Sequence, residues 1–366
     1  MGHVFQFLKK SKKSKARVSR LKTAHGVVNL PNFMPIATRA AVKNLTSEEL
    51  EEIGSEIILS NTYHLFLRPG VEIIKGAGGL HQFMNWPGPI LTDSGGYQIF
   101  SLSKWRKIKA EGVEFSSMLD GKKFLLTPEK AIEIQKDLGS DIMMALDVCP
   151  AGKGSYEEIK KAGETTTAWA KRANKVKKGT GQMLFGIVQG GIYPDLREKS
   201  AREITSCGFD GYALGGFFVG EEEKNSWPAI KKTISFLPPL KPRYLMGAGK
   251  PEQILKAVKE GVDLFDCVIP TRNARHGLLY VFKNNQQIKG KFYEEVHITN
   301  SKYAGDFRPL DKHCHCYTCQ KFTRAYLRHL FMSQEVLALR LATIHNLYFY
   351  LSLMRRIREN IKSGNL

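Results

Sequence analysis

Three aspartates stand at the ends of short apolar runs of the sequence. Asp93 and Asp147 each directly follow such a run, and Asp266 lies at the end of another. Two carboxylates in one pocket suit glycosidic chemistry, in which one attacks the anomeric carbon and the other acts as acid or base. A single aspartate in this position is more often a helix N-cap or a turn residue. Three that converge on one rim favour a catalytic pocket.

Glycine-rich segments follow three more of these runs, at residues 189–191, 215–216 and 247–250. Glycine lets backbone N–H groups approach a planar ligand closely. The first segment also carries Gln189, and Asp and Gln side chains can read the donor and acceptor edges of a nucleobase. Tyr97 and Met246 could stack on such a base, although core packing is the ordinary role of both residue types.

A cysteine cluster with C-x-C-x2-C spacing, Cys314, Cys316 and Cys319, predicts a metal site. Three thiolates at one point need one further ligand to complete a tetrahedral zinc site. Four histidines compete for that place, and spacing alone prefers none of them: His313, His315, His329 and His345. His345 lies in a helical stretch, where a rigid ligand could hold the subdomain together. No position would be left for water, so we expect one structural Zn2+ per chain.

The charge balance favours a polyanionic partner. The chain has 366 residues with a formal net charge of +20 at pH 7, which suits nucleic acid or an anionic membrane better than a purely metabolic role. Lys250, Arg272 and Arg275 lie close to predicted strand ends and could hold phosphates, although any one of them could equally be a solvated surface charge. The basic run 9–17 reads as a solvated tail.

Compartment and membrane topology follow from the same sequence. No run approaches the roughly 20 apolar residues that a membrane span needs, and no signal peptide follows the basic start. Six cysteines are too few for a disulfide scaffold in a chain of this length. We therefore expect a soluble cytoplasmic protein that does not span a membrane.

Eight β-type runs that alternate with helical signals must position these residues. The runs are 33–38, 57–60, 90–92, 142–146, 184–188, 212–214, 244–246 and 264–267. Helix starts are indicated by Thr46 with Glu49, by Ser155 with Glu158 and by Pro residues at 128, 194 and 251. Eight strands that each lead into a helix are typical of an α/β fold of the (β/α)8 TIM barrel type, and a doubly wound open sheet is the alternative.

Three segments fall outside this alternation. We expect a basic N-terminal tail at residues 1–19 and an insertion of short strands at about residues 100–126 within the barrel, which spans 20–276. Residues 277–366, with the cysteine cluster and a basic helical stretch, form the expected C-terminal zinc-binding subdomain.

The sequence resembles the bacterial type of the tRNA-guanine transglycosylase family from about residue 20 to residue 358. The resemblance runs through separate blocks in order: 59–70, 92–100, 187–191, 214–221, 244–251, 265–277 and the cysteine cluster. It implies a (β/α)8 barrel with a zinc subdomain. The implied activity exchanges the wobble guanine (position 34) of the tRNA anticodon for a 7-deazaguanine base in queuosine biosynthesis. A homodimer is implied by the resemblance alone.

The resemblance also implies a role for each candidate residue. Asp266 would be the nucleophile that forms a covalent aspartyl-ribosyl intermediate, and Asp93 the general acid/base. The base-binding set would be Asp147, Gln189, Gly216, Tyr97 and Met246. The tRNA contacts would be Lys250, Arg272 and Arg275. The zinc ligands would be Cys314, Cys316, Cys319 and His345.

Departures from the family pattern concern the base pocket. Val148 stands where the family usually has an acidic residue, and Phe217-Phe218 replaces a smaller Leu-Ala pair. Cys149 and Val219 match the smaller pocket of the bacterial type, which favours the aminomethyl precursor preQ1 over queuine. A non-catalytic tRNA-binding relative and a barrel glycoside hydrolase are the rival interpretations. Intact Asp93 and Asp266 motifs argue against the first, and the basic charge and zinc cluster argue against the second.

Overall fold

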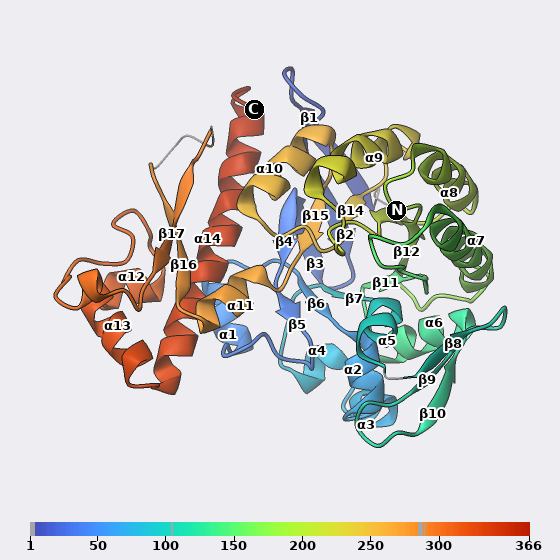
Figure 1. Cartoon of the computed structure of the whole chain (residues 1–366), viewed down its shortest axis with the longest axis horizontal. Coiled ribbons are helices and arrows are strands. Elements are labelled where there is room, and N and C mark those ends of the chain that lie inside the picture. The colour runs from blue at the N-terminus through green and yellow to red at the C-terminus, as the bar shows by residue number, and fades with distance from the viewer. Residues whose placement is uncertain (1–3, 104, 285–287, 289) are drawn as a thin grey trace.

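The central feature of the fold is a parallel barrel surrounded by helices (Figure 1). The computed structural model describes residues 4–103, 105–284, 288 and 290–366. The barrel sheet has the order β4-β15-β14-β13-β12-β11-β7-β6-β5. Its strands are β4 (Asn32–Met34), β5 (Ile36–Ala37), β6 (Ile58–Ser60), β7 (Ile90–Thr92), β11 (Ile142–Met144), β12 (Met183–Val188), β13 (Gly211–Leu214), β14 (Arg243–Leu245) and β15 (Leu264–Asp266).

The first β-run closes the barrel because it is split at Pro35. Its first half, β4, pairs in parallel with the last strand, β15, and its second half, β5, pairs with β6. Proline has no N–H to donate to a ladder, so a strand break at this position is expected. The one run therefore joins both edges of the sheet, which confirms the barrel and excludes the open sheet.

Helices surround the barrel. They are α1 (Ser47–Glu52), α2 (Thr62–Leu67), α3 (Val71–Gly76), α4 (Leu80–Phe83), α5 (Gly96–Leu102), α6 (Pro128–Asp137), α7 (Tyr156–Ala173), α8 (Pro194–Ser206), α9 (Glu223–Phe236), α10 (Pro251–Glu260) and α11 (Ile269–Arg275). Of these, α1, α6, α7, α8 and α10 begin where the sequence signals predicted. Thr46 and Ser155 both form complete capping boxes. Gly261 ends α10 at φ +97°, a left-handed conformation that glycine adopts without strain.

Alternate residues of each strand face two different cores. Leu91 and Met144 pack inside the barrel, whereas their neighbours Ile90 and Met143 pack against the surrounding helices. This period of two is the geometry of a strand that is buried on both faces. It directs the residue at each strand end either into the barrel mouth or under a helix.

The N-terminal segment is folded rather than a solvated tail. Its strands β1 (Phe5–Lys10), β2 (Arg17–Thr23) and β3 (Gly26–Leu30) form an antiparallel sheet. The prediction of a free basic tail was wrong because the charge of a segment does not show which strands it pairs with. β1 is hydrogen-bonded to β2, and Lys9 donates to the carbonyl of Lys362. The role of this lysine run stays open.

A histidine pair fixes the β2–β3 hairpin at the N-terminal end of the barrel. Nδ1 of His25 lies 2.9 Å from one carboxylate oxygen of Asp141, and Nε2 of His81 lies 3.2 Å from the other. The backbone N–H groups of His25 and Ile90 also donate to this carboxylate. Each oxygen of the Asp141 carboxylate therefore has two nitrogen partners, and its hydrogen-bonding capacity is used. We interpret this cluster as structural, since it lies at the end of the barrel opposite the carboxyl ends of the strands.

Residues 106–126 form a separate antiparallel sheet beside α5. Its strands are β8 (Arg106–Ile108), β9 (Val113–Ser116) and β10 (Lys123–Leu126). The strands lie within the segment that the sequence analysis marks as an insertion, and the domain boundaries themselves stay predictions.

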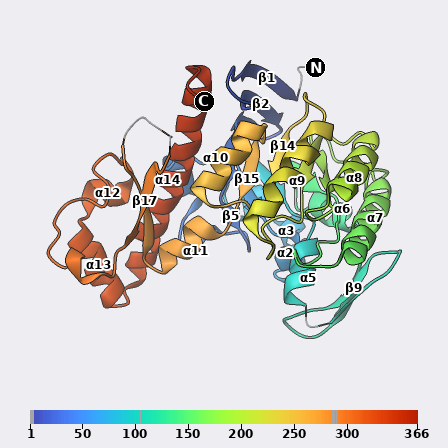
Figure 2. The ribbon, with the colours of Figure 1, turned by 45° about the horizontal axis from the view of Figure 1, so that its top comes forward.

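The C-terminal region packs beside the barrel along one long helix (Figure 2). It contains β16 (Leu278–Phe282), β17 (Tyr293–His297), η1 (Ser301–Tyr303), α12 (Tyr317–Lys321), α13 (Arg324–Met332) and α14 (Val336–Lys362). By length and composition α14 could cross a membrane, but 72% of its apolar window is buried in the protein. It contacts α10, α11, β2 and β4 on one side and α12, α13 and β16 on the other, so it is a core helix.

Candidate active site and metal centre

Asp266 ends β15 with one carboxylate oxygen anchored and the other free. Its Oδ1 accepts hydrogen bonds from the Tyr244 hydroxyl at 2.5 Å and from the Gly247 backbone N–H at 3.0 Å. No hydrogen bond from the described part of the chain reaches Oδ2. Burial raises the pKa of Asp266, against the opposing effect of the two donors. The anchored carboxylate therefore presents one oxygen in a fixed position at the barrel mouth.

Asp93 directly follows β7 and is held by three donors. Asn61 Nδ2 donates to its Oδ2 at 2.5 Å, and the backbone N–H groups of Thr62 and Gly95 donate to Oδ1 at 2.9 and 3.2 Å. Burial raises the pKa of Asp93 to about 6, and the charge of Asp266 adds to this effect. A carboxyl group with a pKa near neutrality can both give and take a proton, as an acid/base group must.

Asp147 and Gln189 meet in the interior of the barrel mouth. Gln189 Nε2 donates to Asp147 Oδ2 at 2.7 Å, and Ser94 Oγ donates to Oδ1 at 3.1 Å. Burial raises the pKa of Asp147. The other amide atom, Gln189 Oε1, is buried without a partner in the described structure. Such an atom is costly unless a ligand satisfies it.

Gly216 leaves room for this amide. Its φ is +70°, and a Cβ there would come within 2.4 Å of Gln189 Oε1, so no larger residue fits without displacing Gln189. The next turn is tied by Glu221, whose carboxylate accepts from the N–H groups of Phe218 and Val219 at 2.5 and 3.0 Å. Cys149 lies nearby as a neutral thiol, since burial raises its pKa to about 12.

The two proposed stacking residues lie on different elements. Tyr97 is on α5 with 51% of its surface exposed, and Met246 follows β14 and is half-buried. The structure gives no contact between the two side chains, and their stacking on a base stays a prediction.

The three predicted phosphate contacts lie around the same strand ends. Lys250 is exposed at the start of α10, and Arg272 and Arg275 lie on α11, which follows Asp266 almost directly. Burial and the neighbouring charge of Arg272 lower the pKa of Arg275. Lys250 Nζ lies 4.0 Å from a carboxylate oxygen of Glu223, whereas Arg272 and Arg275 take part in none of the ion pairs of the described residues. Arginine and lysine side chains of this kind are the usual partners of phosphate oxygens.

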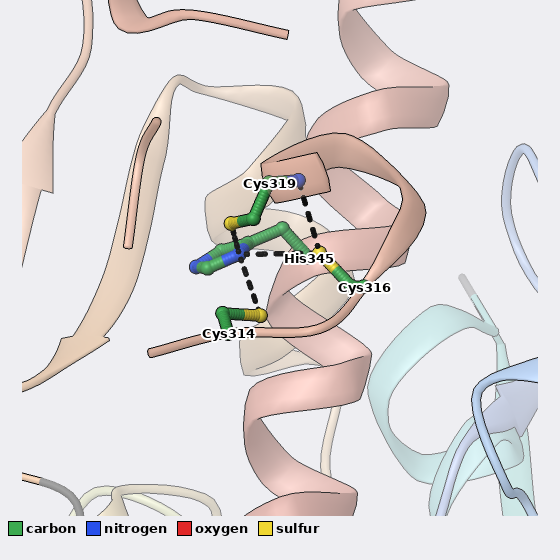
Figure 3. A group of neighbouring side chains, drawn as sticks. All are labelled: Cys314, Cys316, Cys319 and His345. Carbon is green, nitrogen blue, oxygen red and sulfur yellow. Dashed lines mark hydrogen bonds between the residues drawn. The ribbon is translucent and has the colours of Figure 1, made fainter. Parts of the chain in front are cut away.

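The cysteine cluster and His345 converge on one point (Figure 3). His345 Nδ1 lies 3.8, 3.7 and 3.3 Å from the sulfur atoms of Cys314, Cys316 and Cys319. Tetrahedral zinc, with bonds of about 2.3 Å to sulfur and about 2.0 Å to nitrogen, places S and N about 3.5 Å apart. The four side chains can therefore hold a metal ion, and of the four candidate histidines it is His345 that joins the cysteines.

The opposite edge of the His345 ring is also fixed. Its Nε2 donates to the backbone carbonyl of Tyr280 at 2.6 Å, which leaves Nδ1 as the atom that faces the sulfurs. A second hydrogen bond of this kind orients metal-binding histidines in general. The site joins α12 and α14 to β16, so a bound ion would cross-link the C-terminal region.

Several site residues lie outside the set that sequence analysis selected. Asn61 directly follows β6, so the rule that selected Asp93 applies to it as well. Tyr244 donates a hydrogen bond to Asp266, and Glu221 accepts one from the Phe218 N–H, once the barrel mouth has folded. The sequence carries no spacing signal for such contacts.

Comparisons with known proteins agree with this geometry. A family profile described as Queuine tRNA-ribosyltransferase matches residues 11–366. The queuine tRNA-ribosyltransferase of Thermoanaerobacter sp. (strain X514) is 53% identical over 363 residues, which cover 99% of this chain and 94% of that protein. The namesake from Dictyoglomus turgidum is 50% identical over 366 residues, 99% of this chain and 92% of that protein. The namesake from Halothermothrix orenii is 50% identical over 366 residues, 100% of this chain and 95% of that protein. On the strength of this full-length match and of the barrel, the chain belongs to the queuine tRNA-ribosyltransferase family, the tRNA-guanine transglycosylases of queuosine biosynthesis.

Proposed function

We propose that this chain exchanges guanine at position 34 of tRNA for a 7-deazaguanine base, preQ1 in preference to queuine, through a covalent bond to Asp266. The observation that carries the proposal is the pairing of two unlike carboxyl groups at one barrel mouth. Asp266 has a free, fixed oxygen, and Asp93 has a pKa raised to about 6. Pairs of carboxyl groups in different environments are the usual basis of divided nucleophile and acid/base roles.

In this mechanism Asp266 Oδ2 attacks C1′ of the ribose, and the C1′–N9 bond breaks. Protonated Asp93 gives its proton to the departing guanine. The incoming base then loses its N9 proton to the Asp93 carboxylate and attacks C1′, which releases Asp266. The sequence of steps is balanced, because one proton leaves Asp93 and one returns to it.

The hydrogen bonds that the Asp147 carboxylate accepts indicate how a base would be recognised. The N1–H and exocyclic amino groups of guanine would replace Ser94 and Gln189 as donors to its two oxygens. The released Gln189 amide would then be free to rotate, so that its Oε1, a buried atom without a partner in the described structure, can face a donor of the bound base. The Gly216 backbone lies beside it without a Cβ to obstruct the base.

The decisive experiment is the exchange of labelled guanine into tRNA that carries guanine at position 34. We expect incorporation by the wild-type chain and none into tRNA with adenine at that position. Binding of tRNA without exchange would support the non-catalytic relative, and hydrolysis of the glycosidic bond without reincorporation would support a glycoside hydrolase.

The pocket predicts preference among incoming bases. By the resemblance to the smaller pocket of the bacterial type, Cys149 and Val219 would close the wall that faces the 7-substituent, and the carbonyl groups around Phe217 would accept from the cationic aminomethyl group. Exclusion of the queuine ring should cost at least about 1.4 kcal/mol, so kcat/KM for preQ1 should exceed that for queuine by about tenfold or more. Competition of the two bases against labelled guanine-34 tRNA measures the ratio. Equal or better use of queuine would contradict the preference.

Binding of tRNA is predicted to depend strongly on salt. Each phosphate contact by Lys250, Arg272 or Arg275 releases counterions, so Arg272→Ala should make the slope of log K against log salt shallower by about one. Arg202→Ala is the matched control, because Arg202 is exposed on α8 and pairs with Glu198. A slope that is unchanged in Arg272→Ala, measured by filter binding over a salt series, would make Arg272 a bystander.

We further propose that the metal is one structural Zn2+ held by Cys314, Cys316, Cys319 and His345. Cys316→Ser should lower the zinc content to well below one per chain and lower the melting temperature, since the metal cross-links the C-terminal region. Cys207→Ser, at a half-buried cysteine outside the cluster, is the control. Full thermal stability of a metal-free protein, by calorimetry with elemental analysis, would speak against the structural role.

Assembly and compartment complete the proposal. We infer a cytoplasmic homodimer from the family. The exposed Tyr326 on α13 stacks on the half-buried Phe322, and we propose that copies meet on this surface. Light scattering of the purified protein would test the dimer, with a monomer mass at micromolar concentration as the contrary result.

A further inference from the structure

Arg197 is a fully buried cation on α8 that no carboxylate of the described residues contacts directly, although the charge of Glu221 acts on it from a greater distance. The exposed fraction of Arg197 is 0%, and it takes part in none of the ion pairs of the described residues. Another buried arginine, Arg17 of the N-terminal sheet, pairs with Asp263 at 2.5 Å. A buried charge without a counter-ion is costly, so its neighbours must compensate through hydrogen bonds.

The compensating acceptors are backbone carbonyls of the base-reading strand ends. Nε of Arg197 donates to the Gly191 carbonyl at 2.7 Å, Nη1 to the Val188 carbonyl at 3.0 Å, and Nη2 lies 3.5 Å from the Gly216 carbonyl. Val188 and Gly191 flank Gln189 in the sequence. The one guanidinium thus ties the end of β12 to the end of β13.

An aromatic ring covers the guanidinium. The Phe217 ring centroid lies 3.8 Å from Arg197 Cζ, and Phe217 is only 2% exposed. A desolvated cation on an aromatic face is attracted to it. The ring and the three carbonyls together restrain the peptide between Gly216 and Phe217, and in the proposed function this peptide borders the space for the 7-substituent of the base.

We infer that Arg197 is the positioning residue that sets base discrimination in this enzyme, acting through Gln189 and the Gly216–Phe217 peptide. The inference rests on the proposed function. Arg197 touches no substrate in this scheme. It holds in place two loops whose polar atoms contact the base. Its planar guanidinium can donate to several carbonyls at once, which the ammonium group of a lysine cannot do in the same geometry.

The test compares Arg197→Lys with a matched control, Arg243→Lys. Arg243 is also buried, and it also donates to backbone carbonyls, those of Leu237 and Gly261, but it is the first residue of β14, at the end of the strand away from the barrel mouth. Both variants lose a guanidinium fork and keep a positive charge. Each is assayed for melting temperature, for tRNA affinity, and for kcat and KM with guanine and with preQ1.

For Arg197→Lys we expect KM for the free base to rise about tenfold and the preQ1-to-guanine ratio of kcat/KM to change at least threefold. For Arg243→Lys we expect a lower melting temperature with the KM values and the ratio unchanged. Phe217→Leu, which removes the covering ring, should shift the preQ1-to-guanine ratio of kcat/KM in the same direction as Arg197→Lys.

Two outcomes would overturn the inference: an unchanged preQ1-to-guanine ratio in Arg197→Lys, or the same changes in KM and ratio in both arginine variants. In either case, exchange by the wild type leaves the proposed function standing. Absence of exchange by the wild type would overturn the proposed function itself. Should Arg197→Lys fail to fold, Phe217→Leu alone decides, and an unchanged ratio there overturns the inference.

Discussion

Replacement of Asp266 by asparagine is expected to abolish guanine exchange, with turnover lower by about 10⁴-fold or more, as for other lost nucleophiles. The amide cannot attack C1′, yet its carbonyl oxygen can keep the hydrogen bonds from Tyr244 and Gly247. Folding and tRNA affinity should therefore remain. The direct measurement is a denaturing gel of enzyme mixed with tRNA, in which the wild type gives a covalent adduct and the variant gives none.

Tyr244→Phe is the informative companion to this variant. It removes one of the two hydrogen bonds to Oδ1 and leaves the nucleophile in place, so the adduct should still form, at a reduced rate. An Asp266→Asn protein that accumulated adduct would take the nucleophile role away from Asp266.

Replacement of Asp93 by asparagine is expected to lower the rates of both half-reactions by about 10²- to 10⁴-fold, the usual contribution of a general acid/base. The variant can neither protonate the departing guanine nor accept a proton from the incoming base. Single-turnover assays of adduct formation and of base addition to the adduct measure the two steps separately. A variant that slowed only one half-reaction would contradict the shared role.

The pH dependence should separate the two carboxyl groups. Adduct formation needs protonated Asp93, so its rate should fall as pH rises through about 6, and it also needs ionised Asp266, so it should fall again at low pH. Base addition needs ionised Asp93 and should rise through about pH 6. Asp93→Asn should remove the titration near pH 6 from both profiles.

The raised pKa of Asp93 also predicts how the stability of the folded protein depends on pH, and this dependence gives a folding control for Asp93→Asn. Because the folded-state pKa of Asp93 is raised from 3.8 to about 6, ionisation of Asp93 destabilises the folded protein as pH rises through this window. The cost is on the order of 3 kcal/mol at pH 7. Asp93→Asn avoids it, so its lost activity should come with a free energy of unfolding no lower than that of the wild type at pH 7.

The order and type of the barrel elements could be read from the sequence because local signals agree with the fold. Capping boxes at Thr46 and Ser155 and prolines at helix starts act within a few residues. The break at Pro35 and the folded N-terminal sheet depend on partners far along the chain, as in the contact of Lys9 with Lys362. Such partners leave no local pattern, which is why the tail was predicted to be free.

The candidate site divides in the same way. Asp93, Asp147 and Asp266 could be selected because parallel strands all end at one rim. Tyr244 and Arg197 act on backbone or carboxylate atoms that only folding brings near, and core packing is the ordinary expectation for a tyrosine in a strand. Spacing alone could not choose His345 among four histidines, because its place beside the cysteines depends on the docking of α14 onto β16, and it was the family resemblance that implied it.

The split first strand has a consequence for synthesis. β4 has no strand partner until β15 has been synthesised. The helix α14, which packs on β1, β2 and β4, is synthesised later still. At about 5–20 residues per second, the ribosome takes on the order of 10–50 seconds to make the intervening chain. Throughout that interval β4 presents an open edge, and open edges invite pairing with other nascent chains. The antiparallel sheet β1–β3 pairs segments that are neighbours in sequence, so it can form at once. Its Leu21, Val28 and Leu30 belong to the same apolar cluster as Met34 of β4, so this sheet is the first part of the protein able to bury side chains of β4 on the ribosome.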